Sequence, residues 1–113
     1  MTDTECASMH THPDAAPPED GEITALAEFF RTLGAETRLR ILLALDEREL
    51  CAGDLAEALG MAPSAVSNQL KELRQARLIT VRREGRMLYY RLADCHPRDI
   101  VHLALGHIRE EEE

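Results

Sequence analysis

Two predicted helices joined by a glycine turn, with two short β-type segments directly after them, constrain this chain of 113 residues more than any other feature. We expect a short helix over 52–59, a sharp turn at Gly60 and a longer helix over about 63–76. Gly60 supplies the backbone freedom that a sharp turn needs, and Pro63 suits a first helical position. The pair has the proportions of a helix-turn-helix.

The two β-type segments, 78–83 and 86–92, are rich in β-branched and aromatic residues. They alternate in polarity and are separated by Glu84-Gly85, which predicts a β-hairpin. A hairpin directly after a helix-turn-helix is typical of a winged helix. We therefore predict a mainly α fold with a β-hairpin, a winged helix-turn-helix.

Three further helices are expected around this unit. Amphipathic spacing predicts two before it, over about 22–34 and 36–46. A third begins at Asp94 or Pro97 and ends near Glu110. We expect the apolar stripes of the first two helices to lie in the core. In the first helix this stripe consists of Ile23, Leu26, Phe30 and Leu33.

One domain over 21–113 is expected behind a flexible arm over 1–20. The arm is polar, carries three prolines and has few large apolar groups, so it offers little to bury. No stretch approaches the roughly 18 apolar residues of a membrane-spanning helix. The first basic residue is Arg31, so the basic flank of a signal peptide is missing. We expect a cytoplasmic protein with no membrane partner.

Charge is distributed unevenly along the chain, whose net charge is −8. Residues 1–30 carry −7 and residues 92–113 carry −4, whereas residues 31–91 carry +3. Local charge matters more than the total for phosphate binding, because salt screens charges beyond about 8 Å. The basic middle of the chain therefore favours a nucleic-acid partner despite the acidic total.

The helix over 63–76 is the candidate for contact with DNA bases. An α-helix fits the major groove and brings its N-terminal polar side chains to the base edges. For each serine, a helix cap or a solvated hydroxyl is an equally good interpretation, and an arginine run is also typical of a solvated surface. The candidates for base contact are Ser64, Ser67, Asn68 and Gln69. The candidates for phosphate contact are Lys71, Arg74, Arg82, Arg83 and Arg86.

The last predicted helix carries a candidate metal site at Asp94, His96, His107 and Glu110. His96 and His107 share a helix face but lie about 16 Å apart along the axis. Zinc ligands of this kind lie about 2 Å from the ion, so one chain cannot close the site. Two copies of the helix packed antiparallel about a two-fold axis bring the two halves together. The pattern predicts zinc, with cobalt or nickel as competitors, and a homodimer whose C-terminal helix is the dimerisation element. For a lone histidine such as His102 we expect an ordinary surface residue.

A second candidate metal site has softer ligands. Cys51 and Asp54 would open the helix over 52–59, where the helix dipole favours a thiolate. Cys6 and His10 lie on the arm, which would have to fold over to complete the site. Thiolate ligands favour cadmium, lead or zinc. An inert cysteine beside an unstructured arm is the alternative interpretation.

Taken together, these motifs resemble the ArsR/SmtB family of metal-responsive winged-helix repressors, over about 22–110. The stretches that carry the resemblance are ELCAGDL at 49–55, PSAVSNQL at 63–70, RLI at 77–79 and GRMLYY at 85–90. In zinc-sensing members an Asp-x-His and then a His-x-x-Glu pattern on the C-terminal helix holds the metal. The resemblance carries these ligand roles to Asp94, His96, His107 and Glu110. The family's other site, between the arm and the helix before the reading helix, matches Cys6, His10, Cys51 and Asp54.

Three residues depart from this pattern or add to it. Pro97 directly follows His96 and disfavours helical geometry there, so we expect His96 at the helix boundary. Cys95 is an alternative donor for a softer ion, and His12 is an additional histidine on the arm.

The resemblance implies a dimeric repressor that binds operator DNA without metal and leaves it when zinc binds, releasing genes for metal efflux or sequestration. A cadmium- or lead-responsive repressor regulated through the cysteine site is the main alternative. A zinc-buffering protein without DNA function is disfavoured by the arginine-rich hairpin. We expect no enzyme, because four protein ligands leave no open position for an activated water and no HExxH motif is present. No small organic ligand is expected.

Overall fold

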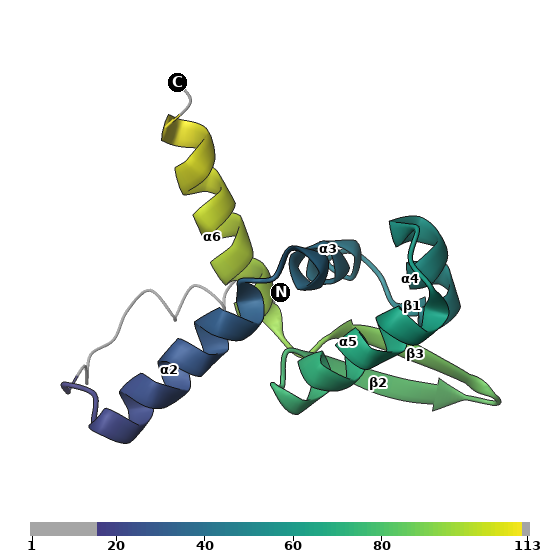
Figure 1. The fold of residues 1–113 in the computed structure, drawn as a ribbon, viewed down its shortest axis with the longest axis horizontal. Helices are drawn as coiled ribbons and strands as arrows, with labels where there is room; N and C mark the ends of the chain where they lie inside the picture. Colours follow the sequence, from purple (N-terminus) through teal and green to yellow (C-terminus); the bar gives the residue numbers. More distant parts are fainter. Residues whose placement is uncertain (1–15, 112–113) are drawn as a thin grey trace.

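In the computed structural model, residues 16–111 form five helices and a three-stranded sheet (Figure 1). The first helices are α2 (Asp20–Leu33) and α3 (Glu36–Ala44), followed by the short strand β1 (Leu50–Cys51). Next come α4 (Ala52–Leu59), α5 (Pro63–Gln75), β2 (Ile79–Glu84), β3 (Met87–Leu92) and α6 (Cys95–Glu111). The predicted mainly α fold with a β-hairpin is confirmed, and all five predicted helices are present.

The turn between α4 and α5 forms as its residue types predict. Gly60 ends α4 with a φ of +66°, and the N–H groups of Gly60 and Met61 bind the carbonyl oxygens of Glu57 and Ala56 at 3.3 and 3.0 Å. This is a Schellman cap, which requires a residue in the left-handed region. Pro63 occupies the first position of α5, where its missing N–H costs no hydrogen bond.

The wing is the hairpin of β2 and β3, which pair antiparallel with Glu84 opposite Met87. The tip is therefore Gly85-Arg86, one residue later than predicted. Gly85 has a φ of +64°, as the first position of a type II′ turn requires. The strand β1 was not predicted. It pairs with β3, so that the sheet order is β1-β3-β2.

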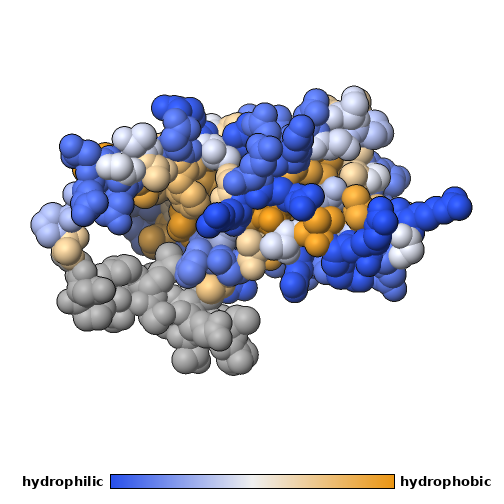
Figure 2. All heavy atoms as spheres, turned by 90° about the horizontal axis from the view of Figure 1, so that it is seen from below, coloured by the Kyte–Doolittle hydropathy of each residue, from blue (hydrophilic) through white to orange (hydrophobic). Residues whose placement is uncertain are grey.

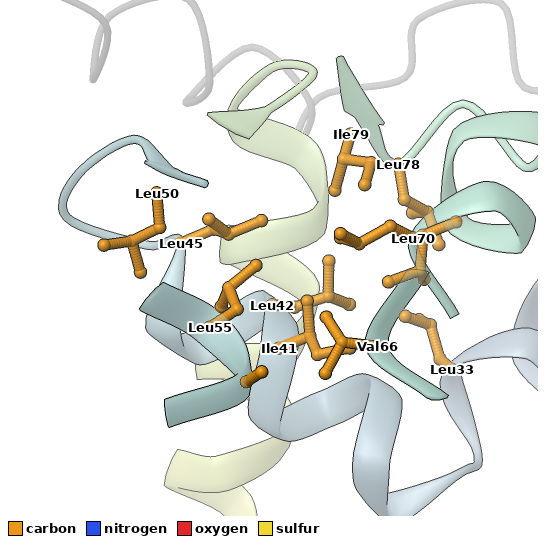
Figure 3. Close-up of a cluster of buried hydrophobic side chains, with 12 residues drawn as sticks. Leu33, Ile41, Leu42, Leu45, Leu50, Leu55, Val66, Leu70, Leu78 and Ile79 are labelled. Carbon is orange, nitrogen blue, oxygen red and sulfur yellow. The ribbon is translucent and has the colours of Figure 1, made fainter. Parts of the chain in front are cut away.

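The core lies where α3, α4 and α5 meet the start of the wing. Figure 3 shows Ile41, Leu55, Val66 and Leu70 pointing into one shared interior, and each is at most 1% exposed. With Leu73, the residues Val66 and Leu70 form the buried stripe of α5, as the helical spacing predicts. The opposite side of α5 is therefore directed outward.

The expectation that the α2 stripe lies in the core is wrong for three of its four residues. Leu33 is buried, but Ile23, Leu26 and Phe30 are 50–53% exposed. Figure 1 shows α2 and α6 extending away from the part that contains α4, α5 and the sheet, so within residues 16–111 most of this stripe stays uncovered. Within residues 16–111, every helix is too short or too polar to span a lipid bilayer.

Candidate DNA-binding surface and metal ligands

The outward side of α5 presents most of the predicted base-contacting residues. Ser64, Ser67 and Asn68 are exposed on its first two turns, and the predicted phosphate contacts Lys71 and Arg74 are exposed further along. A helix that exposes short polar side chains at its start and cations along its length has the chemistry of a major-groove element.

A polar hollow of about 400 Å³ lies between α5 and β3. It is lined by Ser67, Lys71, Arg74, Gln75 and Tyr90. Two cations beside hydroxyl and amide groups suit a phosphate oxygen. Sequence reasoning missed Gln75 and Tyr90. The spacing of Ser67, Lys71 and Gln75 at i, i+4 and i+8 is a signal for Gln75, whereas the position of Tyr90 depends on how the sheet packs.

Gln69 differs from the other predicted base contacts because its amide is bound within the chain. It is half-buried, and its Oε1 accepts a hydrogen bond from Arg38 Nε at 2.8 Å. Arg38 belongs to α3 and was not predicted as a functional residue. It precedes the buried Ile41 and Leu42 by three and four positions, and this spacing places it on the inward side of its helix.

On the wing, Arg82 is held by two carboxylates. Its Nε lies 2.8 and 3.0 Å from the carboxylate oxygens of Glu49, and its Nη1 lies 2.8 Å from Glu84 Oε1. Its guanidinium also stacks over the Tyr89 ring, 4.9 Å from the centroid. The hydrogen bonds to Glu84 and then to Glu49 raise the pKa of Arg82.

The other two wing arginines predicted to contact phosphate lie nearer the tip. Arg83 is exposed on β2, and Arg86 is exposed in the turn itself. Within residues 16–111 neither has a carboxylate partner like those of Arg82, so both can meet a phosphate backbone directly.

Two of the predicted zinc ligands lie side by side at the start of α6. Asp94 precedes the helix, and its Oδ1 accepts the backbone N–H of His96 at 2.9 Å. The same oxygen lies 3.4 Å from His96 Nδ1, and both side chains are about half exposed. His96 is the second residue of α6, which confirms its expected place at the helix boundary, and Pro97 follows in the first turn, where a proline is tolerated.

The other two predicted zinc ligands, His107 and Glu110, are exposed near the opposite end of α6. Because the helix is continuous over Cys95–Glu111, its rise places His96 and His107 about 16 Å apart. Within the described part of the chain, no group of three or more histidine, cysteine or acidic side chains gathers in one place.

His102 lies between the two pairs of predicted ligands and has a different partner. Its Nε2 is 2.6 Å from Asp46 Oδ2, and its side chain is 49% exposed. This contact connects the middle of α6 to the turn that follows α3. The histidine is thus a half-exposed surface residue, as expected, with a partner that sequence spacing does not reveal.

Half of the predicted cysteine site lies in the described residues. Cys51 is buried and precedes α4 as its N-cap residue, and Asp54 is exposed in the first turn of that helix. The predicted opening of the short helix by these two residues is confirmed. Cys6, His10 and His12 lie outside the described residues.

Comparison with known proteins agrees with this architecture. The model of the family described as bacterial regulatory protein, arsR family, matches residues 35–81. A transcriptional repressor SmtB homolog from Synechocystis sp. is 46% identical over 85 residues, which cover 75% of this chain and 64% of that protein. The HTH-type transcriptional repressor SmtB from Mycobacterium tuberculosis is 40% identical over 96 residues, covering 85% of this chain and 71% of the relative. The chain belongs to the ArsR family.

A solved structure supports the winged-helix fold of this ArsR-family chain. The crystal structure of the AntR antimony-specific transcriptional repressor matches it with a TM-score of 0.75 at 38% identity. The match covers 88% of this chain and 91% of that one. The predicted winged helix-turn-helix is therefore confirmed, and its family is that of bacterial regulatory proteins.

Proposed function

We propose that this ArsR-family protein is a metal-responsive transcriptional repressor. In this proposal a homodimer binds double-stranded operator DNA without metal and leaves it when zinc binds, which releases genes for metal efflux or sequestration. The observation that carries the proposal is the Asp94–His96 pair at one end of α6, with His107 and Glu110 at the other end.

The spacing of the first pair suits one zinc ion. Two ligand atoms of a tetrahedral site with bonds of about 2.0–2.1 Å lie about 3.3 Å apart. Asp94 Oδ1 and His96 Nδ1 are 3.4 Å apart. One carboxylate and one imidazole can therefore serve as two adjacent ligands with little rearrangement, and His107 and Glu110 of a second copy would supply the remaining two.

Exposed apolar surface supports the second copy. Leu103 and Ile108 on α6 are 67% and 54% exposed. An apolar groove of about 320 Å³ lies between α2, α3 and α6, with Phe30, Leu43 and Ile108 among its lining residues. On the side of the molecule seen from below, which α6 points away from, Figure 2 shows further apolar surface open between hydrophilic side chains. Antiparallel packing of two α6 helices would cover the exposed apolar side chains of α6 and join the two halves of the metal site.

DNA contact is proposed for the outward side of α5 and for the wing. Ser64, Ser67, Asn68 and Gln69 are the proposed base-contacting residues, and Lys71, Arg74, Arg82, Arg83 and Arg86 are the proposed phosphate contacts. Metal bound between two α6 helices would favour one arrangement of the subunits, and hence one spacing of the two α5 helices. By linkage, DNA must weaken zinc binding by the factor by which zinc weakens DNA binding.

The alternative is regulation through Cys6, His10, Cys51 and Asp54, with cadmium or lead as the sensed ion. The position of Cys51 as the N-cap residue of α4, with Asp54 in the first turn, supports it, because both donors lie at the same helix start and a sulfur donor favours a softer ion. Titrations of a Cys51→Ser variant with zinc and with cadmium separate the two sites.

The test is a fluorescence anisotropy titration on duplex DNA from upstream of the protein's own gene. We expect the metal-free protein to bind and zinc to release it. His107→Ala should bind DNA and lose its zinc response, whereas the control His102→Ala, on the same helix, should keep both properties. Full release of His107→Ala by zinc would assign regulation to the cysteine site. Failure of the chelator-treated protein to bind would refute the repressor proposal.

A further inference from the structure

One guanidinium connects α5 to the two helices that precede the helix-turn-helix. Arg38, on α3, is only 19% exposed and makes three contacts through three different nitrogens. Nε donates to Gln69 Oε1 at 2.8 Å, and Nη2 is bound to Glu72 Oε1. Nη1 makes a longer contact of 3.5 Å with the carbonyl oxygen of Thr32, in the last turn of α2. The planar fork of arginine suits such a multiple contact, and a lysine ammonium cannot reproduce it.

The hydrogen bond from Arg38 limits which atoms of Gln69 can face a DNA base. Gln69 lies three residues after Val66 and four before Leu73, which are both buried, so it occupies the edge of α5 next to α3. A glutamine that pairs with adenine uses its oxygen as acceptor and its nitrogen as donor together. Here one lone pair of the oxygen accepts from Arg38, which directs the oxygen toward α3 and leaves the Nε2 amide as the group directed to a base. A lone donor matches the acceptors of guanine or the O4 of thymine.

The same arginine also neutralises an acidic group on α5. Glu72 is one of only two acids among residues 61–91, which carry seven basic residues. An unpaired carboxylate on a DNA-facing helix opposes phosphate binding. Bound to Arg38, Glu72 connects α5 to α3 without adding an unpaired negative charge.

We propose that Arg38 is a positioning residue for operator recognition, which acts by fixing the Gln69 amide and not by contacting DNA. This inference rests on the proposed function of the chain as a DNA-binding repressor. It assigns to α3 a role in sequence preference, whereas phosphate binding is left to Lys71, Arg74 and the wing.

The test uses a pool of short duplexes with a randomised centre, from which each protein variant selects its preferred sequences. Arg38→Lys keeps the charge and loses the fork. Gln69→Ala removes the proposed base contact. Arg40→Lys is the matched control, because Arg40 lies on the same helix and pairs only across the surface with Glu36 within the described residues.

We expect wild type and Arg40→Lys to enrich the same inverted repeat. Arg38→Lys should lose about tenfold in preference, close to 1.4 kcal/mol, at the base pairs where Gln69→Ala also loses preference. Its affinity for a duplex of random sequence, and the salt dependence of that affinity, should stay within about twofold of wild type because its phosphate contacts are intact.

Two results would overturn the inference. One is an Arg38→Lys variant with wild-type base preferences, and the other is an equal loss of affinity for all sequences, which a purely structural role would produce. If Arg38→Lys is not folded by circular dichroism, the double variant Arg38→Ala/Glu72→Gln, which removes the contact and balances the charge, replaces it with the same expected outcome. Absence of any enriched inverted repeat with wild type would refute the proposed function instead.

Discussion

The carboxylate of Asp94 caps the start of α6 and also lies beside the imidazole of His96. Its Oδ1 accepts the His96 backbone N–H at 2.9 Å and lies 3.4 Å from His96 Nδ1. The first contact is an N-cap, which satisfies one of the donors that every helix start leaves unpaired. The second places two proposed metal ligands next to each other.

Substitution should separate these two roles. Asn caps a helix about as well as Asp, so Asp94→Asn should change the free energy of unfolding by less than about 0.5 kcal/mol, whereas Asp94→Ala should lower it by about 1 kcal/mol. Loss of a charged ligand should weaken zinc binding at least about tenfold in both variants. Urea unfolding of the metal-free protein and competition with a zinc chelator measure the two effects. Wild-type zinc affinity in Asp94→Asn would exclude Asp94 as a ligand.

Arg77 follows the end of α5 in a left-handed backbone conformation that arginine does not favour. Its φ is +64°, and the N–H groups of Arg77 and Leu78 bind the carbonyl oxygens of Arg74 and Leu73 at 2.9 and 3.0 Å. A left-handed conformation costs a residue with a side chain roughly 1–2 kcal/mol, which glycine avoids. Arg77→Gly should therefore raise the free energy of unfolding by about 0.5 kcal/mol, after the entropy lost by glycine is counted.

A matched substitution tests this explanation. Arg74→Gly, inside the same helix, should lower the free energy of unfolding by about 1 kcal/mol. Both variants are compared with wild type by urea denaturation. A decrease for Arg77→Gly as large as that for Arg74→Gly would show that the backbone conformation at 77 is not what limits stability there.

Local sequence patterns predicted the helices and turns of this fold better than they predicted which segments pack on each apolar face. The spacing of Val66, Leu70 and Leu73 identified the buried side of α5, and Gly60 marked the end of α4, because both signals depend on neighbours within one turn. The apolar stripe of α2 was equally clear, yet Phe30 is 52% exposed. Periodicity shows that a face is apolar but not whether the same chain or a second copy packs on it.

For the candidate site too, contacts between residues close in sequence were predictable and long-range contacts were not. Asp94 and His96 are two positions apart, so a helix start is enough to bring them together. Arg38 and Gln69 are 31 positions apart, and their contact exists only after α3 packs on α5. The strand β1 has two residues, too few for any alternation to appear. Its partner β3 is also distant in sequence, so the pairing was missed.

Glu49 is expected to limit the contribution of the wing to DNA binding. Its carboxylate engages Arg82 Nε, so Glu49→Gln should make more of this arginine available to phosphates and remove a local negative charge. Affinity for a duplex of random sequence at low salt should rise about threefold, and the slope of log affinity against log salt should steepen by about one. Glu28→Gln, which removes the partner of Arg31 on α2, should change neither quantity. An unchanged slope in Glu49→Gln would mean that Arg82 does not meet phosphate.

Leu103 is expected to decide the oligomeric state. At 67% exposure it is the most exposed large apolar side chain in the part of the chain that the structure describes, so it contributes little to the core of its own subunit. A buried charge is costly in an apolar interface, so Leu103→Glu should yield a folded monomer by sedimentation velocity. Met87→Glu, a similar change at a 44% exposed position on the wing, should remain a dimer. Because half of the proposed zinc ligands come from a second copy, the Leu103→Glu monomer should also bind zinc much more weakly than Met87→Glu. A dimeric Leu103→Glu with full zinc affinity would contradict antiparallel packing of two α6 helices.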